Sequence, residues 1–176
     1  MNNTDAIHGE RPPDLTTASS DPLAPTREEL QAFIQANTYY YLPKWDALDP
    51  TLRAAPKGTF NWAACFLWQF WMAYRKMYLF AVICVVSFFV LNSILLSLGV
   101  PFYYGLFLMW WFGRYGSALY KRHAIAKIRQ IKSTIAPEYW PQAFKDKGGT
   151  SFWAVVPFII WLVFTYFIMF WSMGRQ

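Results

Sequence analysis

"TFNWAACFLWQFWMAYRKMYLF", residues 59–80, decides how the fold is predicted, because it is nearly long enough to be a membrane helix and then stops. Fourteen residues, 60–73, carry no charge and include three tryptophans. They would form only about 21 Å of helix, short of the roughly 30 Å hydrocarbon core of a bilayer. Tryptophan also favours the head-group layer. We therefore predict an interfacial or shallow re-entrant helix at 60–73, with a tilted fourth span as the alternative. Arg75 and Lys76, which follow this helix, are expected at the head groups.

Three later segments are long enough to cross a bilayer. Segments 79–100 and 152–173 carry no charge, and segment 102–120 carries Arg114 alone. The whole chain is 56% hydrophobic and only 15% charged, whereas ordinary soluble domains carry about 25% charged residues. The chain thus has too few polar side chains to cover a soluble globule. The sequence predicts an all-α integral membrane protein with three transmembrane spans.

Composition divides the chain into three parts, a disordered tail, a cytoplasmic helix with a loop, and the membrane domain: 1–25, 26–58 and 59–176. The tail is rich in Pro, Ser, Thr and Asp and cannot bury enough apolar surface to offset the entropy of ordering.

The cytoplasmic helix begins with a clear signal. Thr26 followed by Glu29 fits a capping box, and the apolar residues that follow recur on one helical face. We predict an amphipathic helix over 27–41 that ends near Pro43 and docks on the membrane face. A helix of a soluble core would show the same pattern and is the alternative.

Positive charge beside the apolar segments predicts a partner and an orientation. Residues 1–59 hold five Lys/Arg and eight Asp/Glu, whereas residues 60–176 hold eleven and two. Cytoplasmic loops are enriched in Lys and Arg. We therefore expect a cytoplasmic amino terminus and, if 60–73 does not cross, a periplasmic carboxyl terminus. No nucleic-acid partner is expected, because no soluble basic fold surrounds these cations.

Residues 121–135 should form a basic amphipathic helix that lies along the cytoplasmic interface. We expect anionic head groups of the bilayer to contact its cations, which are Lys121, Arg122, Lys127, Arg129 and Lys132. The alternative is a cytoplasmic cap packed on other protein. His123 in this segment is predicted to be an interfacial polar residue and not a ligand.

A few polar or small residues interrupt the predicted spans. Arg114 is the single charge inside one, and it either anchors the helix by reaching the head groups or marks a functional site. Gly113 and Ser117 have the spacing of small residues in helix packing, and Asn92 offers a polar contact on the preceding span. Helix packing is the main interpretation of these three residues, and a permeation path is the alternative.

The opening stretch resembles domain-of-unknown-function family 2628, which consists of small membrane proteins found mostly in bacteria. The residues that match its aromatic and basic pattern are Phe60, Asn61, Trp62, Ala63, Ala64, Trp71, Tyr74, Arg75, Lys76, Met77 and Tyr78. A second family feature appears at 116–120, where Ser117 replaces the usual asparagine. The likeness covers about residues 30–132 and leaves the third span outside. It implies an inner-membrane protein with a cytoplasmic amino terminus, and the family supplies no biochemical activity.

The sequence offers little for catalysis. Between Asp49 and Glu138 there is no Asp or Glu, and the only histidines are His8 and His123. Proton relays and metal-assisted hydrolysis inside a membrane need such groups, so we expect no catalytic or metal site, no cofactor and no enzyme. We predict a non-catalytic membrane interaction, assembly or regulatory component, with a protein partner or as a homo-oligomer. The alternative is a subunit of an oligomeric channel or transporter.

Overall fold

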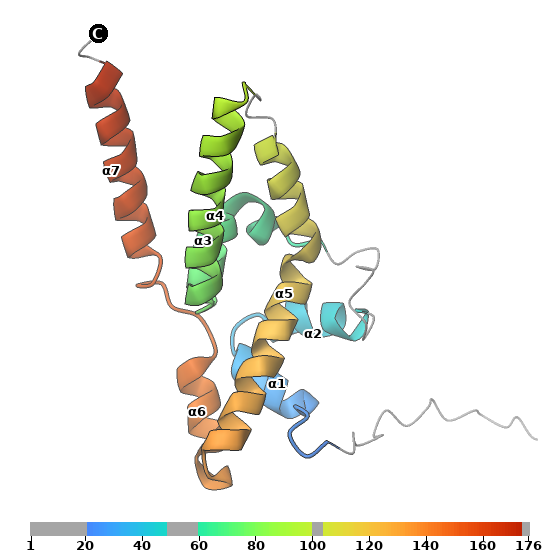
Figure 1. Ribbon diagram of the computed structural model, residues 1–176. Coiled ribbons are helices and arrows are strands. Elements are labelled where there is room, and N and C mark those ends of the chain that lie inside the picture. Colours follow the sequence, from blue (N-terminus) through green and yellow to red (C-terminus); the bar gives the residue numbers. More distant parts are fainter. Residues whose placement is uncertain (1–20, 49–59, 100–103, 174–176) are drawn as a thin grey trace, which may run out of the picture.

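One long helix, α5 (Tyr104–Thr134), joins the two halves of the molecule (Figure 1). The computed structural model describes residues 21–48, 60–99 and 104–173. All regular elements in these ranges are helical, which confirms the predicted all-α class. The others are α1 (Arg27–Ile34), α2 (Thr38–Asp46), α3 (Trp62–Tyr74), α4 (Tyr78–Ser97), the short 3-10 helix η1 (Pro137–Tyr139), α6 (Trp140–Lys147) and α7 (Val156–Met173).

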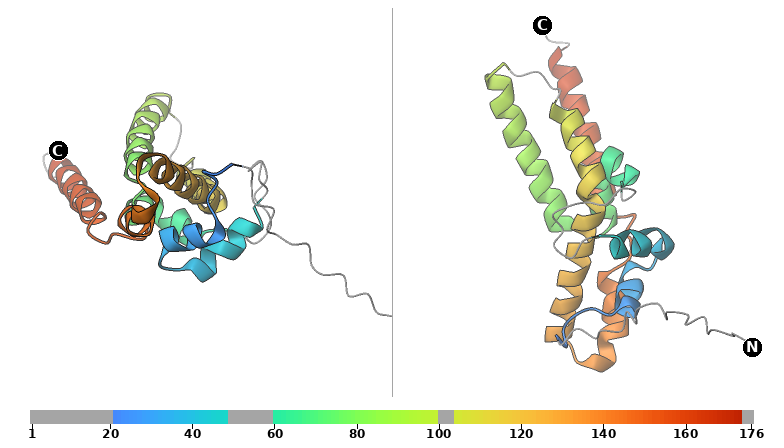
Figure 2. Two further views of the ribbon diagram at one scale, coloured as in Figure 1. Left: turned by 90° about the horizontal axis from the view of Figure 1, so that it is seen from below. Right: turned by 90° about the vertical axis from the view of Figure 1, so that its right-hand side faces the viewer.

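Helix α5 corrects one prediction, because the expected span 102–120 and the expected interfacial helix 121–135 are a single element. Neither Gly nor Pro occurs between Ser117 and Thr134, so nothing in the sequence breaks the helix there. Its lower half keeps the direction of its upper half (Figures 1 and 2). The buried side chains of this lower half are Ala124, Ile128 and Ile131, in a core to which α1 and α6 also contribute.

The first helix begins as predicted and ends earlier. The Thr26 hydroxyl accepts a hydrogen bond from the amide of Glu29 at 3.2 Å, and the Glu29 carboxylate accepts one from the amide of Thr26 at 2.8 Å. This confirms the capping box. Helix α1 then stops at Ile34, because the backbone turns through positive φ values of 56° at Gln35 and 68° at Asn37.

Helix α2 starts after this turn and continues through Pro43 to Asp46. The single helix predicted over 27–41 is therefore two helices, and Pro43 is not its end. The break is stabilised from elsewhere in the chain. The amide of Gly149 donates a hydrogen bond to the carbonyl of Phe33 at 2.7 Å, and the Gln35 side chain donates one to the carbonyl of Lys145 at 2.8 Å.

Helix α3 is the short aromatic helix predicted at 60–73. Its N-cap is Asn61, whose side-chain oxygen accepts a hydrogen bond from the amide of Ala64 at 3.0 Å. The backbone is non-helical at Trp68 (φ 2°, ψ −80°), so the helix is kinked. It packs against α4 and α5, and the amide of Asn61 donates to the carbonyl of Gly113 at 2.7 Å. Its start therefore docks partway along α5.

Two glycines of α5 allow this close approach of α3. A Cβ at Gly113 would overlap the Phe60 ring, and a Cβ at Gly116 would lie 2.6 Å from the Cβ of Ala64. The predicted packing role of Gly113 agrees with this geometry, although the contact is with α3 and not with another full-length span.

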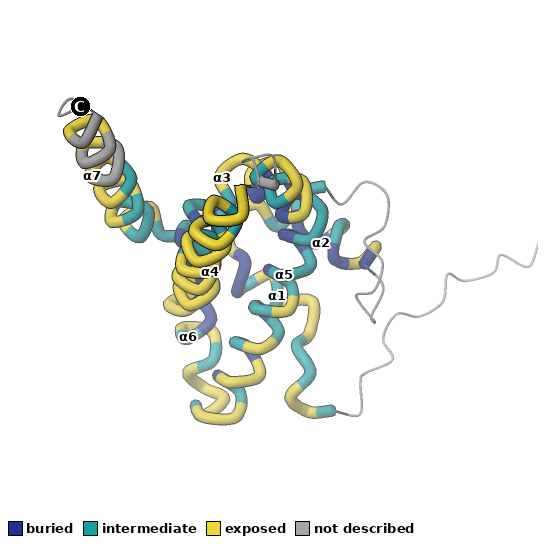
Figure 3. Tube along the Cα trace, turned by 45° about the horizontal axis from the view of Figure 1, so that its top comes forward, coloured by how far each residue is buried: buried dark blue, intermediate teal, exposed yellow. Residues whose placement is uncertain are grey.

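Helix α4 has the length and composition to cross a membrane, and little of it is buried. Among the described residues it is the one helix that meets both criteria, so the prediction of three spans is not confirmed. Figure 3 shows exposed residues over α4 and much of α7, whereas buried residues gather where α2, α3 and α5 meet. The end of α4, the start of α5 and the end of α7 lie at one end of the molecule, with α1 and α6 at the other (Figures 1 and 2).

Several predictions concern residues outside the described ranges, including most of the tail, the loop at 49–58 and the turn at 100–101. Residues 21–25 of the predicted disordered tail are described, and they contact α5. Asp21 pairs with Arg129 at 3.0 Å, and Lys132 donates a hydrogen bond to the carbonyl of Ala24 at 3.1 Å. This short part of the tail is therefore structured.

Candidate functional site

Aromatic side chains from three helices form a cluster where the two halves of the molecule meet. Tyr120 of α5 lies at its centre, with ring-centroid distances of 5.1 Å to Tyr41, 5.3 Å to Trp45 and 6.1 Å to Trp71. The indole N–H of Trp71 donates a hydrogen bond to the hydroxyl of Tyr41 at 3.1 Å. Such ring pairs are worth about 0.5–1.5 kcal/mol beyond their buried area, so the cluster fixes α2 and α3 against α5.

Arg75, the residue that ends α3, points into this cluster. Its side chain is buried, with the whole residue only 3% exposed. The guanidinium carbon lies 4.5 Å from the ring centroid of Tyr41, 5.1 Å from that of Tyr120 and 5.9 Å from that of Tyr74. Cation–π contacts of this kind contribute about 0.5–2 kcal/mol each. They partly offset the loss of hydration of the charge.

The hydrogen bonding of Arg75 is incomplete. One terminal nitrogen donates to the carbonyl of Ala36 at 3.3 Å, and the buried Nε has no hydrogen-bond partner. In the part of the chain that the structure describes, no carboxylate forms an ion pair with Arg75. A buried cation without an anion is unfavourable, so this guanidinium retains the capacity to bind an acceptor.

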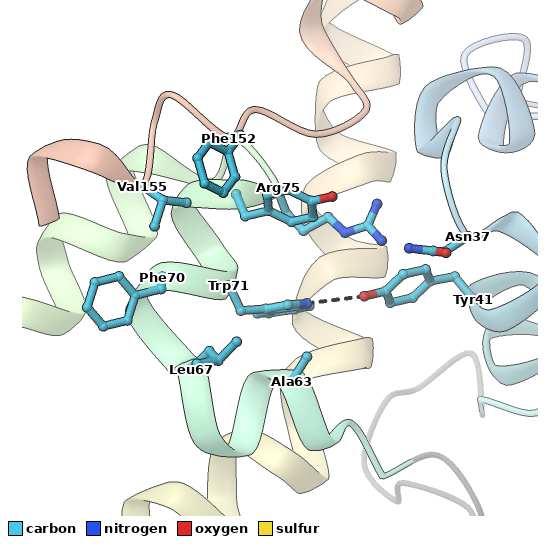
Figure 4. Close-up of a pocket in the computed structure, with 10 residues that line it drawn as sticks. Asn37, Tyr41, Ala63, Leu67, Phe70, Trp71, Arg75, Phe152 and Val155 are labelled. Atoms are coloured by element: carbon cyan, nitrogen blue, oxygen red, sulfur yellow. Dashed lines mark hydrogen bonds between the residues drawn. The ribbon is translucent and has the colours of Figure 1, made fainter. Parts of the chain in front are cut away.

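A pocket of about 460 Å³ opens beside Arg75, between α2, α3 and the segment before α7 (Figure 4). Arg75 and Asn37 occupy one end. The Asn37 side chain makes no capping hydrogen bond to its own helix, although Asn37 is the N-cap of α2. The rest of the wall is aromatic or aliphatic and is formed by Tyr41, Ala63, Leu67, Phe70, Trp71, Tyr74, Phe152 and Val155. The pocket is thus polar at one end and apolar along the remainder.

A second, basic groove of about 750 Å³ lies between the start of α4 and the middle of α5. Three cations line it, Lys76, Arg122 and Lys127, together with Tyr78, Phe80 and His123. Burial, with a smaller contribution from Lys127, lowers the pKa of His123 to about 4. The imidazole is therefore neutral at pH 7, and the positive charge of the groove comes from the Lys and Arg side chains.

The residues quoted for the resemblance to family 2628 do not lie together at one site. Some line the pocket or the basic groove, and others are buried in the interior. Arg75 was expected at the head groups, and the structure places its side chain inside the protein instead. Lys76, the next residue, points away from the cluster and donates a hydrogen bond to the carbonyl of Asp146 at 2.9 Å. The buried members are Asn61, Ala64, Trp71, Arg75 and Met77, and the exposed ones are Trp62, Ala63 and Tyr78.

The cations of α5 that were predicted to contact head groups also have different surroundings in the structure. Lys132 is used inside the protein, where its side chain is 5% exposed and pairs with Glu29 at 3.1 Å. Lys121 donates a hydrogen bond to the carbonyl of Trp45 at 2.7 Å, and Arg129 pairs with Asp21. Arg122 and Lys127 line the basic groove. The head-group contact predicted for these two cations stays a prediction, whereas Lys132 forms its ion pair with α1.

The other predicted positions are not brought into either site. Asn92 on α4 and Arg114 on α5 are half-buried. Ser117 is buried, and its carbonyl accepts a hydrogen bond from the indole of Trp45 at 3.1 Å. Sequence reasoning missed Tyr41 and Tyr120, the two rings closest to Arg75. The aromatic run at 39–41 was the available signal, but Tyr41 was assigned to the apolar face of one amphipathic helix.

The described residues contain no group of three or more His, Cys, Asp or Glu side chains that could hold a metal ion. The chain matches no family model, no curated protein and no solved structure. The resemblance to family 2628 therefore stays a prediction that rests on the residues quoted for it.

Proposed function

We propose that the chain is a multi-pass protein of the bacterial inner membrane with a non-catalytic role in membrane interaction, assembly or regulation. The observation that carries the proposal is the distribution of exposed apolar side chains. They cover α4, the upper part of α5 and α7, and include Leu79, Val86, Leu106, Trp110 and Phe170. A soluble monomer rarely exposes a contiguous apolar surface of this extent.

The proposed topology has three spans, formed by α4, the upper half of α5 and α7. Two features support it. The ends of these helices alternate between the two ends of the molecule (Figure 1), and the basic groove lies at the start of α4, the end of that helix nearer to α1 and α6. Because Lys and Arg are retained on the cytoplasmic side, α1, α2 and α6 would be cytoplasmic. Helix α3 would enter from this side without crossing.

The basic groove would hold this end of the molecule at the membrane surface. Each Lys or Arg near anionic lipid contributes about 1 kcal/mol, and Lys76, Arg122 and Lys127 line one groove. The neighbouring Tyr78 and Phe80 suit the boundary between head groups and acyl chains.

A subunit of an oligomeric channel or transporter is the second candidate. The observation that favours it is the small contact of α7 with the rest of the described chain. Trp161 of α7 meets Phe89 of α4 at 5.2 Å, and Phe158 of α7 meets Phe70 of α3 at 6.4 Å. Long apolar faces of α4 and α7 are left for a second copy to cover. A native mass measurement that finds an oligomer without another protein would favour this candidate over an assembly role.

Membrane integration is tested with a charge in the middle of α4. Val86 is 56% exposed, and a charged residue at a span centre costs about 2.5–3.5 kcal/mol on insertion scales. Val86→Asp should therefore lower the fraction of chain that resists an alkaline carbonate wash of the membranes, whereas Val86→Thr should not. If the wild-type chain is released by the wash, or if Val86→Asp is retained as well as Val86→Thr, α4 does not span.

A further inference from the structure

We infer that the pocket beside Arg75 binds one anionic phospholipid, with the phosphate at Arg75 and Asn37 and an acyl chain along the apolar wall. The inference rests on the proposed membrane location and goes beyond it, because it names a specific ligand site. It differs from the basic groove, which lies between the start of α4 and the middle of α5 and whose lining residues are separate.

The polar end of the pocket is suited to bind an anion. Arg75 is almost fully buried, its Nε lacks an acceptor, and no carboxylate of the described chain pairs with it. A phosphate would accept charge-assisted hydrogen bonds from this guanidinium, and arginine suits phosphate through its planar fork of donors. Asn37 adds an amide at the same end (Figure 4). It is also the N-cap of α2, so the positive end of that helix dipole adjoins the site.

The remaining wall of the pocket is apolar and therefore suits a hydrocarbon chain and not a small soluble anion. Leu67, Phe70, Phe152 and Val155 extend away from Arg75 along the pocket. Leu67 and Phe152 are 52% and 69% exposed, so the pocket is open on this side. A volume of about 460 Å³ lies in the roughly 300–1,000 Å³ range of ligand sites. It can hold a head group and the first part of a chain, with the rest in the bilayer.

The depth of the site fits the same ligand. Arg75 lies three residues before the start of α4 at Tyr78, which is where the proposed first span begins. The guanidinium is thus at the level of the cytoplasmic head groups, and the apolar wall runs along α3 toward the bilayer interior. A lipid could enter sideways without leaving the membrane.

The test is native mass spectrometry of the intact chain in detergent, titrated with phosphatidylglycerol or with phosphatidylcholine that carries the same acyl chains. We expect one phosphatidylglycerol to bind at least about tenfold more tightly than phosphatidylcholine, in keeping with a charge-assisted contact. Inorganic phosphate at millimolar concentration should not displace it. Equal binding of the two lipids, or displacement by phosphate alone, would overturn the inference.

Three variants locate the site. Arg75→Gln removes the cation, and Ala63→Phe fills the pocket from an exposed wall position without touching the cation, so it remains informative if Arg75→Gln does not fold. Each should weaken phosphatidylglycerol binding about tenfold or more. Lys76→Gln is the matched control, because it removes the adjacent charge, which faces the basic groove. If Lys76→Gln weakens binding and Ala63→Phe does not, the lipid lies in the groove and the inference fails.

These outcomes are distinguishable from a failure of the proposed function. A chain that remains in carbonate-washed membranes but shows no preference for phosphatidylglycerol contradicts only the lipid site. A chain that is released from those membranes contradicts the membrane location itself.

Discussion

Arg75 and Lys76 are adjacent cations whose side chains point in different directions. Arg75 enters the aromatic cluster, whereas Lys76, at a positive φ of 58°, reaches the carbonyl of Asp146. Sequence reasoning placed both charges at the end of the short aromatic helix, and this position is correct. It could not give their directions, because these depend on where Tyr41 and Tyr120 meet, and both are distant in the sequence.

The ion pair between Lys132 and Glu29 ties α5 to α1, and its side chains are only 5% and 16% exposed. Glu29→Gln would leave Lys132 buried without its anion, so we expect a loss of up to about 3 kcal/mol of stability. Glu28→Gln, at the neighbouring exposed position, is the matched control and should change stability little. The measurement is the thermal midpoint in detergent. Equal midpoints for the two variants would show that the buried pair adds nothing.

The buried imidazole of His123 should make the stability of the folded chain depend on pH. Burial lowers its pKa in the folded chain to about 4 from an unfolded value of 6.5. Between these values the unfolded chain binds the proton more readily, so this contribution to stability is present above pH 6.5 and is lost as the pH falls toward 4. The thermal midpoint should therefore drop between pH 7 and pH 5, and less so in His123→Gln. An identical drop in both proteins would mean that His123 is already hydrated in the folded chain.

At the scale of elements, features that depend on neighbouring residues could be predicted from the sequence, whereas those that depend on distant contacts could not. The capping box at Thr26, the short aromatic helix and the apolar α4 follow from neighbouring residues. The break between α1 and α2 depends on a hydrogen bond from Gly149 to the carbonyl of Phe33, which no local pattern reveals. The turn at 35–37 also carries the Ala36 carbonyl that Arg75 contacts. The missed break is thus part of the candidate site.

The continuity of α5 is testable at the boundary where two separate segments were predicted. Arg122 is exposed in the middle of the helix. Arg122→Pro should cost about 3 kcal/mol or more, because proline removes a helical hydrogen bond and clashes with the preceding turn. Arg122→Ala removes the same charge but keeps the helix, and it should be close to wild type. The measurement is the thermal midpoint of each variant. A midpoint for Arg122→Pro close to that of Arg122→Ala would indicate that the helix is naturally broken at this position.

At the scale of the whole molecule, exposed apolar side chains and ion pairs lie in different parts of the described chain. Exposed large apolar residues concentrate in α3, α4, the upper half of α5 and α7, whereas the ion pairs of the described residues join the tail, α1, α2 and the lower half of α5. What the sequence could not supply is the interior of the charged part. Four of the five cations expected at lipid contact other protein groups, namely Lys121, Lys127, Arg129 and Lys132. Charge counts cannot distinguish a cation at a head group from one paired inside a helical cap.

The proposed topology places the charged half in the cytoplasm, and the end of α4 and the start of α5 on the other side of the membrane. Single cysteines at Ser97 and Lys147, both exposed positions at opposite ends, test it in a background without Cys65 and Cys84. In spheroplasts, a membrane-impermeant thiol reagent should label Ser97→Cys directly and Lys147→Cys only after the membrane is permeabilised. Labelling of Lys147→Cys in intact spheroplasts, or equal labelling of both sites before permeabilisation, would contradict the account.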